Sequence, residues 1–137
     1  MPNSEDHANR WLQLLASQRL PGAETFRTHV AAGRISSLCT CGCHGFGFSV
    51  PADARLDRLT TGSGLYCEIA FASNAEEEIN VLLFADERGY FCEAKITLGS
   101  NVEPMPDTII ATATDGIWPS HSVVPGTDIS LESANEK

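Results

Sequence analysis

The spacing of apolar residues changes at Gly33, and this change constrains the fold more than any other feature of the sequence. Before Gly33, apolar residues recur every three or four positions, from Ala8 to Leu20 and again from Ala23 to Ala32. This is the spacing of one helical face. Ser4, followed by two acidic residues, is typical of a helix N-terminus, and Pro21-Gly22 separates the two segments. We therefore expect two helices joined by a tight turn.

After Gly33, apolar and polar residues alternate, as in strands with one buried face. Hairpin turns are expected at Ser73–Glu77 and Asp86–Gly89, a loop at Pro51–Ser63, and an added edge strand at Thr108–Thr114. The other expected strands are Arg34–Cys41, His44–Val50, Leu65–Phe71, Glu78–Ala85 and Tyr90–Leu98.

One of these strands has an unusual composition. Phe46, Phe48 and Val50 share one face of the segment, whereas Gly45 and Gly47 leave its other face nearly bare. The pattern as a whole predicts an α+β fold, in which two N-terminal helices pack on a mainly antiparallel sheet of about five to six strands.

The length and composition indicate one folded domain over residues 1–137. The chain has 137 residues, of which 42% are hydrophobic and 20% charged, and this is typical of a globular domain. We expect frayed ends at residues 1–4 and 130–137. No secretory leader or apolar run of membrane-spanning length is visible, so we expect a cytoplasmic protein that does not associate with a membrane. The sequence does not indicate the oligomeric state.

The charge is strongly acidic, with 18 acidic and 9 basic side chains and a net charge of −9. Such a field repels phosphate, so nucleic-acid binding is not expected. It favours a basic protein partner, although it could equally serve only solubility. The candidate partner-binding residues lie at two expected turns, and they form one acidic patch if the tips of the two hairpins lie close together. These residues are Glu76, Glu77, Glu78, Asp86 and Glu87.

The segment that carries the most chemistry contains three cysteines spaced by two and a histidine. In an extended strand Cys39, Cys41 and Cys43 project from one side, and His44 projects from the other unless Gly42 forms a turn. Three thiolates and an imidazole suit tetrahedral zinc, although structural sites more often use Cys-x2-4-Cys spacing. Zinc is therefore one hypothesis for this segment, and no other cofactor is expected.

Buried thiols are the simpler interpretation of the cysteines, because cysteine packs well as a small apolar side chain. Cys67 and Cys92 fall at inward positions of neighbouring expected strands, where they could also complete a metal site from the same face. A redox function is disfavoured by the absence of a Cys-x-x-Cys pair. Five cysteines is an odd number, which excludes a fully paired disulfide framework within the chain, and in a reducing compartment most or all of them should be thiols or metal ligands.

No catalytic motif is present: the chain lacks a nucleophile elbow, a P-loop, a zinc-protease motif and a dinucleotide fingerprint. We therefore do not expect an enzyme. An activity without such a motif would be indicated by a deep pocket that holds several titratable groups with perturbed pKa values.

The order of the segments between about residues 21 and 110 resembles a group of small bacterial proteins with a Cys-x-Cys-Gly-Cys motif and no established activity. In that group the position after the third cysteine is not reliably histidine. The resemblance implies a bacterial cytosolic domain and no catalytic residues. The matching residues are Cys39, Cys41, Gly42, Cys43, Gly89, Glu93, Pro104 and Pro106.

The favoured hypothesis is a small acidic binding protein, such as an immunity protein that inhibits a basic toxin or nuclease. It follows from the net charge and the missing catalytic motifs. The first alternative is a zinc-binding module built on Cys39, Cys41 and Cys43. The second is a structural domain of unknown role.

Overall fold

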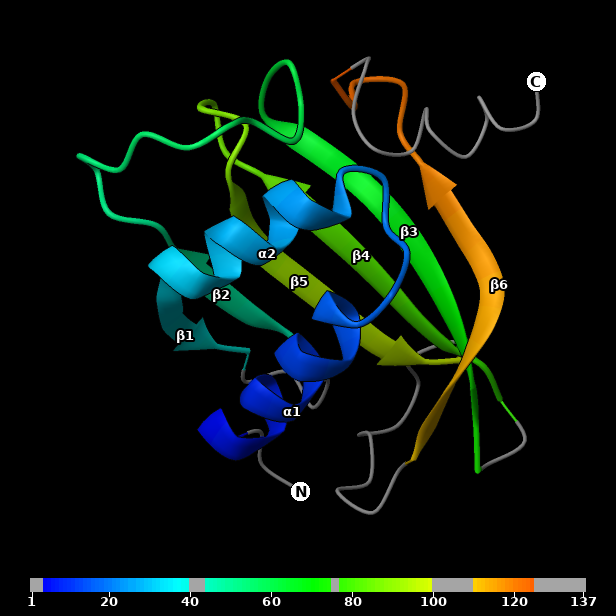
Figure 1. Ribbon diagram of the computed structural model, residues 1–137. Coiled ribbons are helices and arrows are strands. Elements are labelled where there is room, and N and C mark those ends of the chain that lie inside the picture. The colour runs from blue at the N-terminus through cyan, green and yellow to red at the C-terminus, as the bar shows by residue number, and fades with distance from the viewer. Residues whose placement is uncertain (1–3, 40–43, 75–76, 100–109, 125–137) are drawn as a thin grey trace.

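The computed structural model of the chain describes residues 4–39, 44–74, 77–99 and 110–124. Two helices come first in the chain and six strands follow, as the change of spacing at Gly33 predicts (Figure 1). The elements are α1 (Glu5–Ala16), α2 (Ala23–Ala32), β1 (Arg34–Leu38), β2 (Phe46–Ser49), β3 (Gly64–Ser73), β4 (Ile79–Ala85), β5 (Phe91–Leu98) and β6 (Ala111–Pro119).

The strands form one sheet in the order β1-β2-β5-β4-β3-β6, and every neighbouring pair is antiparallel. β3, β4 and β5 make a central meander, while the hairpin of β1 and β2 adds to β5 and the last strand adds to β3. Both helices lie over the same face of the sheet (Figure 1). The predicted α+β fold, two N-terminal helices on a mainly antiparallel sheet, is confirmed.

The first helix begins where its cap predicts and ends earlier than expected. The Ser4 side chain accepts a hydrogen bond from the His7 backbone N–H, which satisfies one of the amides left open at a helix start. At the other end, both the backbone N–H and the hydroxyl of Ser17 donate to the Leu14 carbonyl. The helix therefore stops at Ala16, and Leu20 is buried from the connection to α2.

The core lies between the helices and the face of the sheet that they cover. Phe26 of α2 packs edge-on against Phe91 of β5, with 5.1 Å between the ring centroids, and stacks on Tyr66 of β3. The first helix contributes a buried stripe that includes Trp11 and Leu15. Burial of these apolar side chains supplies most of the stability that orders the sheet.

Two bulges change which side chains of β3 and β5 face the core. One lies in β3 between Leu65 and Cys67, so that Tyr66 and Cys67 are both buried. The other lies in β5, where Cys92 is the extra residue opposite Phe84 and Ala85 of β4. Phe91 is therefore buried, while Cys92 is only half-buried. Strict alternation predicts that Leu65 and Cys92 point inward, and both predictions are wrong, because an extra residue in a strand reverses the faces next to it.

The last strand lies at one edge of the sheet, as expected, but it runs through Pro119 rather than ending at Thr114. None of the helices in the described part of the chain is both long and apolar enough to cross a membrane.

Candidate functional site

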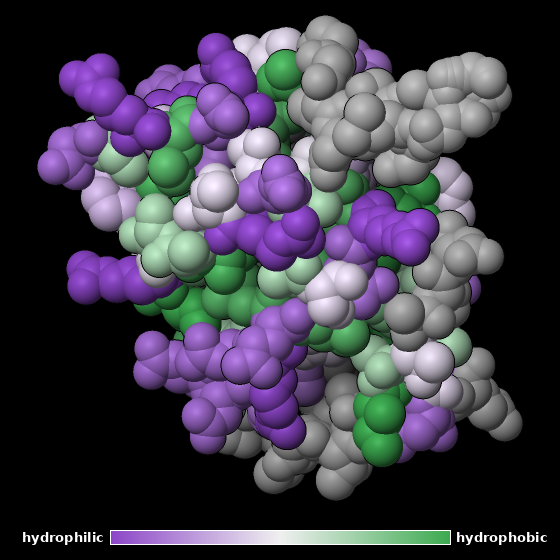
Figure 2. Space-filling model, in the orientation of Figure 1, coloured by the Kyte–Doolittle hydropathy of each residue, from purple (hydrophilic) through white to green (hydrophobic). Residues whose placement is uncertain are grey.

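The two faces of the sheet differ in what covers them. The helices cover one face, and their outer surface is dominated by hydrophilic side chains with apolar residues between them (Figure 2). No described helix or strand covers the other face, which we call the open face. Two rows of paired residues cross it. They are Ser37–Gly47–Glu93–Phe84–Leu65 and Lys95–Leu82–Glu68–Trp118.

Apolar side chains on the open face remain in contact with solvent. Leu65, Leu82 and Phe84 are partly buried, and Trp118 at the sheet edge is 54% exposed. Among the described residues, Trp118 and Ile110 are the large hydrophobic side chains that are most exposed. Exposed apolar side chains that gather on one surface are typical of contact sites.

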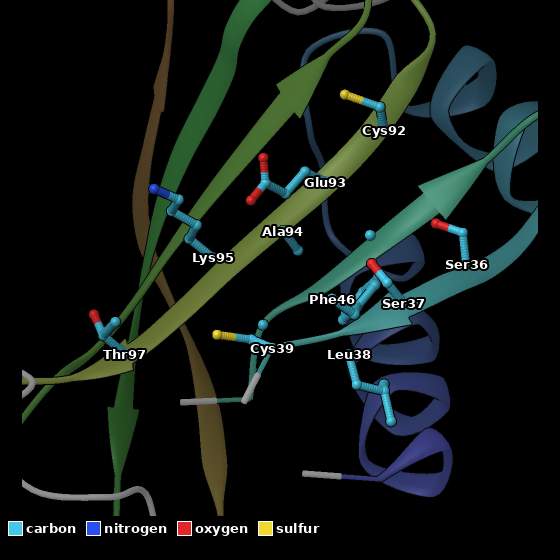
Figure 3. A pocket seen from close by; sticks show the side chains of 12 residues that line it. Ser36, Ser37, Leu38, Cys39, Phe46, Cys92, Glu93, Ala94, Lys95 and Thr97 are labelled. Atoms are coloured by element: carbon cyan, nitrogen blue, oxygen red, sulfur yellow. The ribbon is translucent and has the colours of Figure 1, made fainter. Parts of the chain in front are cut away.

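A groove of about 600 Å³ runs along β2 on this face (Figure 3). Gly45 and Gly47 form its floor, since neither carries a side chain. One wall comes from β1 and the other from β5. The residues that line the β2 groove are Ser36, Ser37, Leu38, Cys39, Gly45, Phe46, Gly47, Cys92, Glu93, Ala94, Lys95 and Thr97.

The pairing of β2 explains the shape of the groove. Gly47 is paired with Ser37 on one side and with Glu93 on the other, so these two side chains face each other across a residue without a side chain. Strands are spaced by about 4.8 Å, which separates the two walls by roughly 10 Å. A Cβ added to Gly47 would lie 2.6 Å from the Ser37 hydroxyl oxygen, so glycine keeps the groove open here. The face of β2 that the sequence predicted to be nearly bare is therefore the face on which the groove forms.

Two charged side chains of β5 lie on the same wall of the groove. The Lys95 ammonium is 5.8 Å from the centre of the Phe84 ring, which places it over the neighbouring strand β4. Glu93 forms no ion pair with any described residue. The ion pair found in these parts of the chain joins Arg88 to Asp86. Glu93 therefore keeps a carboxylate available to a ligand.

The thiols do not form the arrangement that the sequence suggested. Cys67 lies in the core, whereas Cys92 lines the β2 groove on the opposite face, and β4 separates their strands. A shared site for these two residues is therefore wrong. Burial raises the pKa of Cys92 to about 11, with further contributions from Asp86 and Glu93 against an opposing one from Arg88. Burial also raises the pKa of Cys67. Both residues are thus poor nucleophiles near neutral pH.

The predicted metal ligands are only partly described. Cys39 lines the groove on the open face, whereas His44 is buried beneath the helices, so these two residues do not converge. Cys41 and Cys43 lie outside the described residues. Within residues 4–39, 44–74, 77–99 and 110–124, no group of three or more histidine, cysteine or acidic side chains is arranged to hold a metal ion. Zinc binding by the cysteine segment stays a prediction.

His44 instead packs against α1. Its ring stacks on His7 with 4.4 Å between the centroids, and its Nδ1 accepts a hydrogen bond of 3.1 Å from the Trp11 indole N–H. An indole nitrogen can only donate, so Nδ1 of His44 carries no proton. The contact joins the start of the chain to the segment that precedes β2.

The predicted acidic patch does not assemble as one surface. Glu77 and Glu78 precede β4, and Asp86 and Glu87 follow it, so the two pairs lie at opposite ends of a seven-residue strand. That strand is about 23 Å long. Asp86 is engaged in the turn, where it pairs with Arg88 at 2.9 Å. Glu76 lies outside the described residues.

The acidic charge is unevenly distributed along the chain. Residues 1–58 hold five acidic and six basic side chains, whereas residues 59–137 hold thirteen acidic and three basic ones. The helices, β1 and β2 belong to the first part, and the other four strands belong to the second. The net negative charge thus belongs to the part of the chain that contains β3–β6.

Comparison of the chain with protein-family models, with curated protein sequences and with solved structures gives no match.

Proposed function

We propose that this chain is a non-enzymatic binding protein of the bacterial cytoplasm, and that a basic protein partner docks on its open face. The observation that carries this proposal is the uncovered face itself, where Trp118 is 54% exposed beside partly buried Leu82 and Phe84. Aromatic residues of this kind are frequent anchors of protein interfaces.

The charge supports a basic partner. The chain carries −9 overall, and the excess of acidic residues falls in the part that contains β3–β6. Complementary charge accelerates association and selects against acidic competitors. A basic toxin or nuclease, with this chain as its immunity protein, is the partner class that fits best.

The chemistry of the described thiols agrees with a binding role in a reducing compartment. Cys67 and Cys92 are free thiols, and their raised pKa values make them poor nucleophiles near neutral pH. The groove is open, and its lining residues match no catalytic arrangement that we recognise.

The decisive experiment is capture of partners from the native host at about 50 mM and 500 mM salt, followed by titration with the purified partner. We expect a basic protein whose affinity falls steeply with salt. Trp118→Ala should weaken binding at least tenfold. Ile110→Ala serves as the control, because it removes a side chain that is 61% exposed but lies outside the two rows of the open face. A partner that is acidic, or that binds equally well to Trp118→Ala, would overturn the proposal.

A further inference from the structure

The β2 groove is the most specific feature of the open face, because it has a defined floor, two walls and two charged side chains, Glu93 and Lys95, that form no ion pair with a described residue. Its floor is backbone at Gly45 and Gly47, so a ligand can approach more closely there than over a strand that carries side chains. The Ser36 and Ser37 hydroxyls are exposed on the β1 wall. Glu93 stands opposite, directly beside Gly47.

The position of Glu93 in the groove favours a cation beside Gly47. Glu93 has no ion pair with a described residue, and the one basic side chain that lines the groove, Lys95, lies over Phe84 instead. The thiol of Cys92 is a second indicator of the local field. Burial raises its pKa most, Asp86 and Glu93 raise it further, and Arg88 opposes them.

We propose that an extended segment of the basic partner lies along the β2 groove and places an arginine or lysine side chain against Glu93. This inference rests on the proposed function. The serine hydroxyls and the glycine backbone contact the segment, and the Glu93 carboxylate forms the ion pair. Arginine suits the site best, since its planar guanidinium pairs with a carboxylate through two parallel hydrogen bonds.

The dimensions fit an extended chain rather than a helix. The walls are separated by roughly 10 Å, which accommodates one strand of a partner, whereas a helix with its side chains is 10 to 12 Å across. β2 has four residues, so the groove spans about 13 Å and takes about four residues of an extended segment. A second copy of this chain would bring another −9 to the same surface, so charge disfavours it as the occupant.

The test uses the full chain and a defined probe, a six-residue peptide of alternating arginine and threonine, with a glutamate-for-arginine peptide as its negative counterpart. Amide chemical shifts recorded at about 50 mM salt should change at residues 36–39, 45–47 and 92–97 with the arginine peptide only. Glu93→Gln should weaken binding about three- to fivefold, as expected for the loss of one exposed ion pair. Glu24→Gln removes an exposed carboxylate from α2 and should change the affinity little.

A second variant tests the groove by shape rather than by charge. Ser37 is exposed on the groove wall, so Ser37→Trp should block the groove without disturbing the core and should abolish the shifts. Ala31→Trp on the exposed side of α2 is the matched control.

The outcomes separate this inference from the proposed function. Amide shifts that the arginine peptide induces around Glu77 and Glu78 would overturn the inference about the groove, and so would a peptide affinity that Glu93→Gln and Ser37→Trp leave unchanged. The proposal of a basic partner would stand in either case. A salt-independent dimer of the chain that buries residues 36–47 would also overturn the groove. Capture of no salt-sensitive basic protein from the host would overturn both.

Discussion

At the scale of single residues, His29 shows how a titratable group can belong to the core. Its side chain is fully buried and joins three segments of the chain. The Phe91 backbone N–H donates to Nδ1 at 3.2 Å, so the proton lies on Nε2, which donates to the Asp57 carbonyl at 2.6 Å. Burial lowers the pKa of His29 below 6.5, and the Asp57 hydrogen bond opposes this only in part. The folded protein therefore holds this imidazole neutral.

The first prediction is that acid destabilises the fold through His29. The unfolded chain binds a proton near pH 6.5 and the folded chain only at lower pH. The contribution of His29 to stability is thus complete above about pH 6.5 and is lost as the pH falls toward the lowered folded pKa. Urea unfolding at pH 7.5 and 5.5 should show this loss, and His29→Gln should reduce it. His121→Gln, at an exposed position, should keep it.

The second prediction concerns the hydrogen bond between Trp11 and His44. Trp11→Phe removes the donor and leaves the buried Nδ1 of His44 without it, which should lower the free energy of unfolding by about 1–3 kcal/mol. Trp118→Phe, at the exposed edge of the sheet, should change it by less than about 0.5 kcal/mol. Urea denaturation at pH 7.5 measures both, and equal effects would show that the hydrogen bond contributes little.

At the scale of elements, the turn between β4 and β5 is organised by one side chain. The Asp86 carboxylate accepts hydrogen bonds from the backbone N–H groups of Arg88 and Tyr90 and pairs with the Arg88 guanidinium. Gly89 adopts a φ of 80°, in the left-handed region that glycine enters without strain. An aspartate that was expected to face a partner is thus part of the turn itself.

The third prediction is that Asp86→Ala lowers the free energy of unfolding by about 1–2 kcal/mol, because two backbone amides lose their acceptor. Glu87→Ala removes the neighbouring exposed carboxylate and should change stability by less than about 0.5 kcal/mol. Thermal unfolding of the two variants checks the difference. Similar melting temperatures would mean that Gly89 alone determines the turn.

The sequence predicted which segments form strands, but not which of their side chains face the core. Alternation located β3 and β5, a more continuously apolar run located β4, and the glycines of β2 indicated the bare face from which the groove forms. The bulges were not predictable, because an extra residue leaves the local pattern intact while it reverses every face beyond it. Cys92 was therefore expected in the core. The separation of Glu78 from Asp86, in contrast, follows from the expected strand between them, whose two ends lie about 23 Å apart.

At the scale of the whole molecule, Cys67 reports on the cooperativity of the fold. It lies in the core with no exposed surface, and burial raises its pKa. A reagent can therefore reach its thiol only when the helices and the sheet separate, which makes its modification a measure of global unfolding.

The fourth prediction is that Cys67 reacts with a small thiol reagent at pH 8 at a rate that approaches the rate of global unfolding. Cys92 should react earlier, though slowly, since it is half-buried and its pKa is about 11. Mass spectrometry of digested samples over time separates the two sites. Modification of Cys67 before Cys92 would indicate local opening of β3, contrary to the continuous core.

The pairing of β2 with β5 has a consequence for how the chain is made. The first fifty residues that emerge from the ribosome contain both helices, β1 and β2, but β2 has no further strand to pair with until β5 follows, more than forty residues later. Phe46 and Phe48, which pack against Phe91 of β5, lack this partner during that interval, when aggregation competes with folding. Synthesis of β5 is thus the step at which β1 and β2 can first join the rest of the sheet.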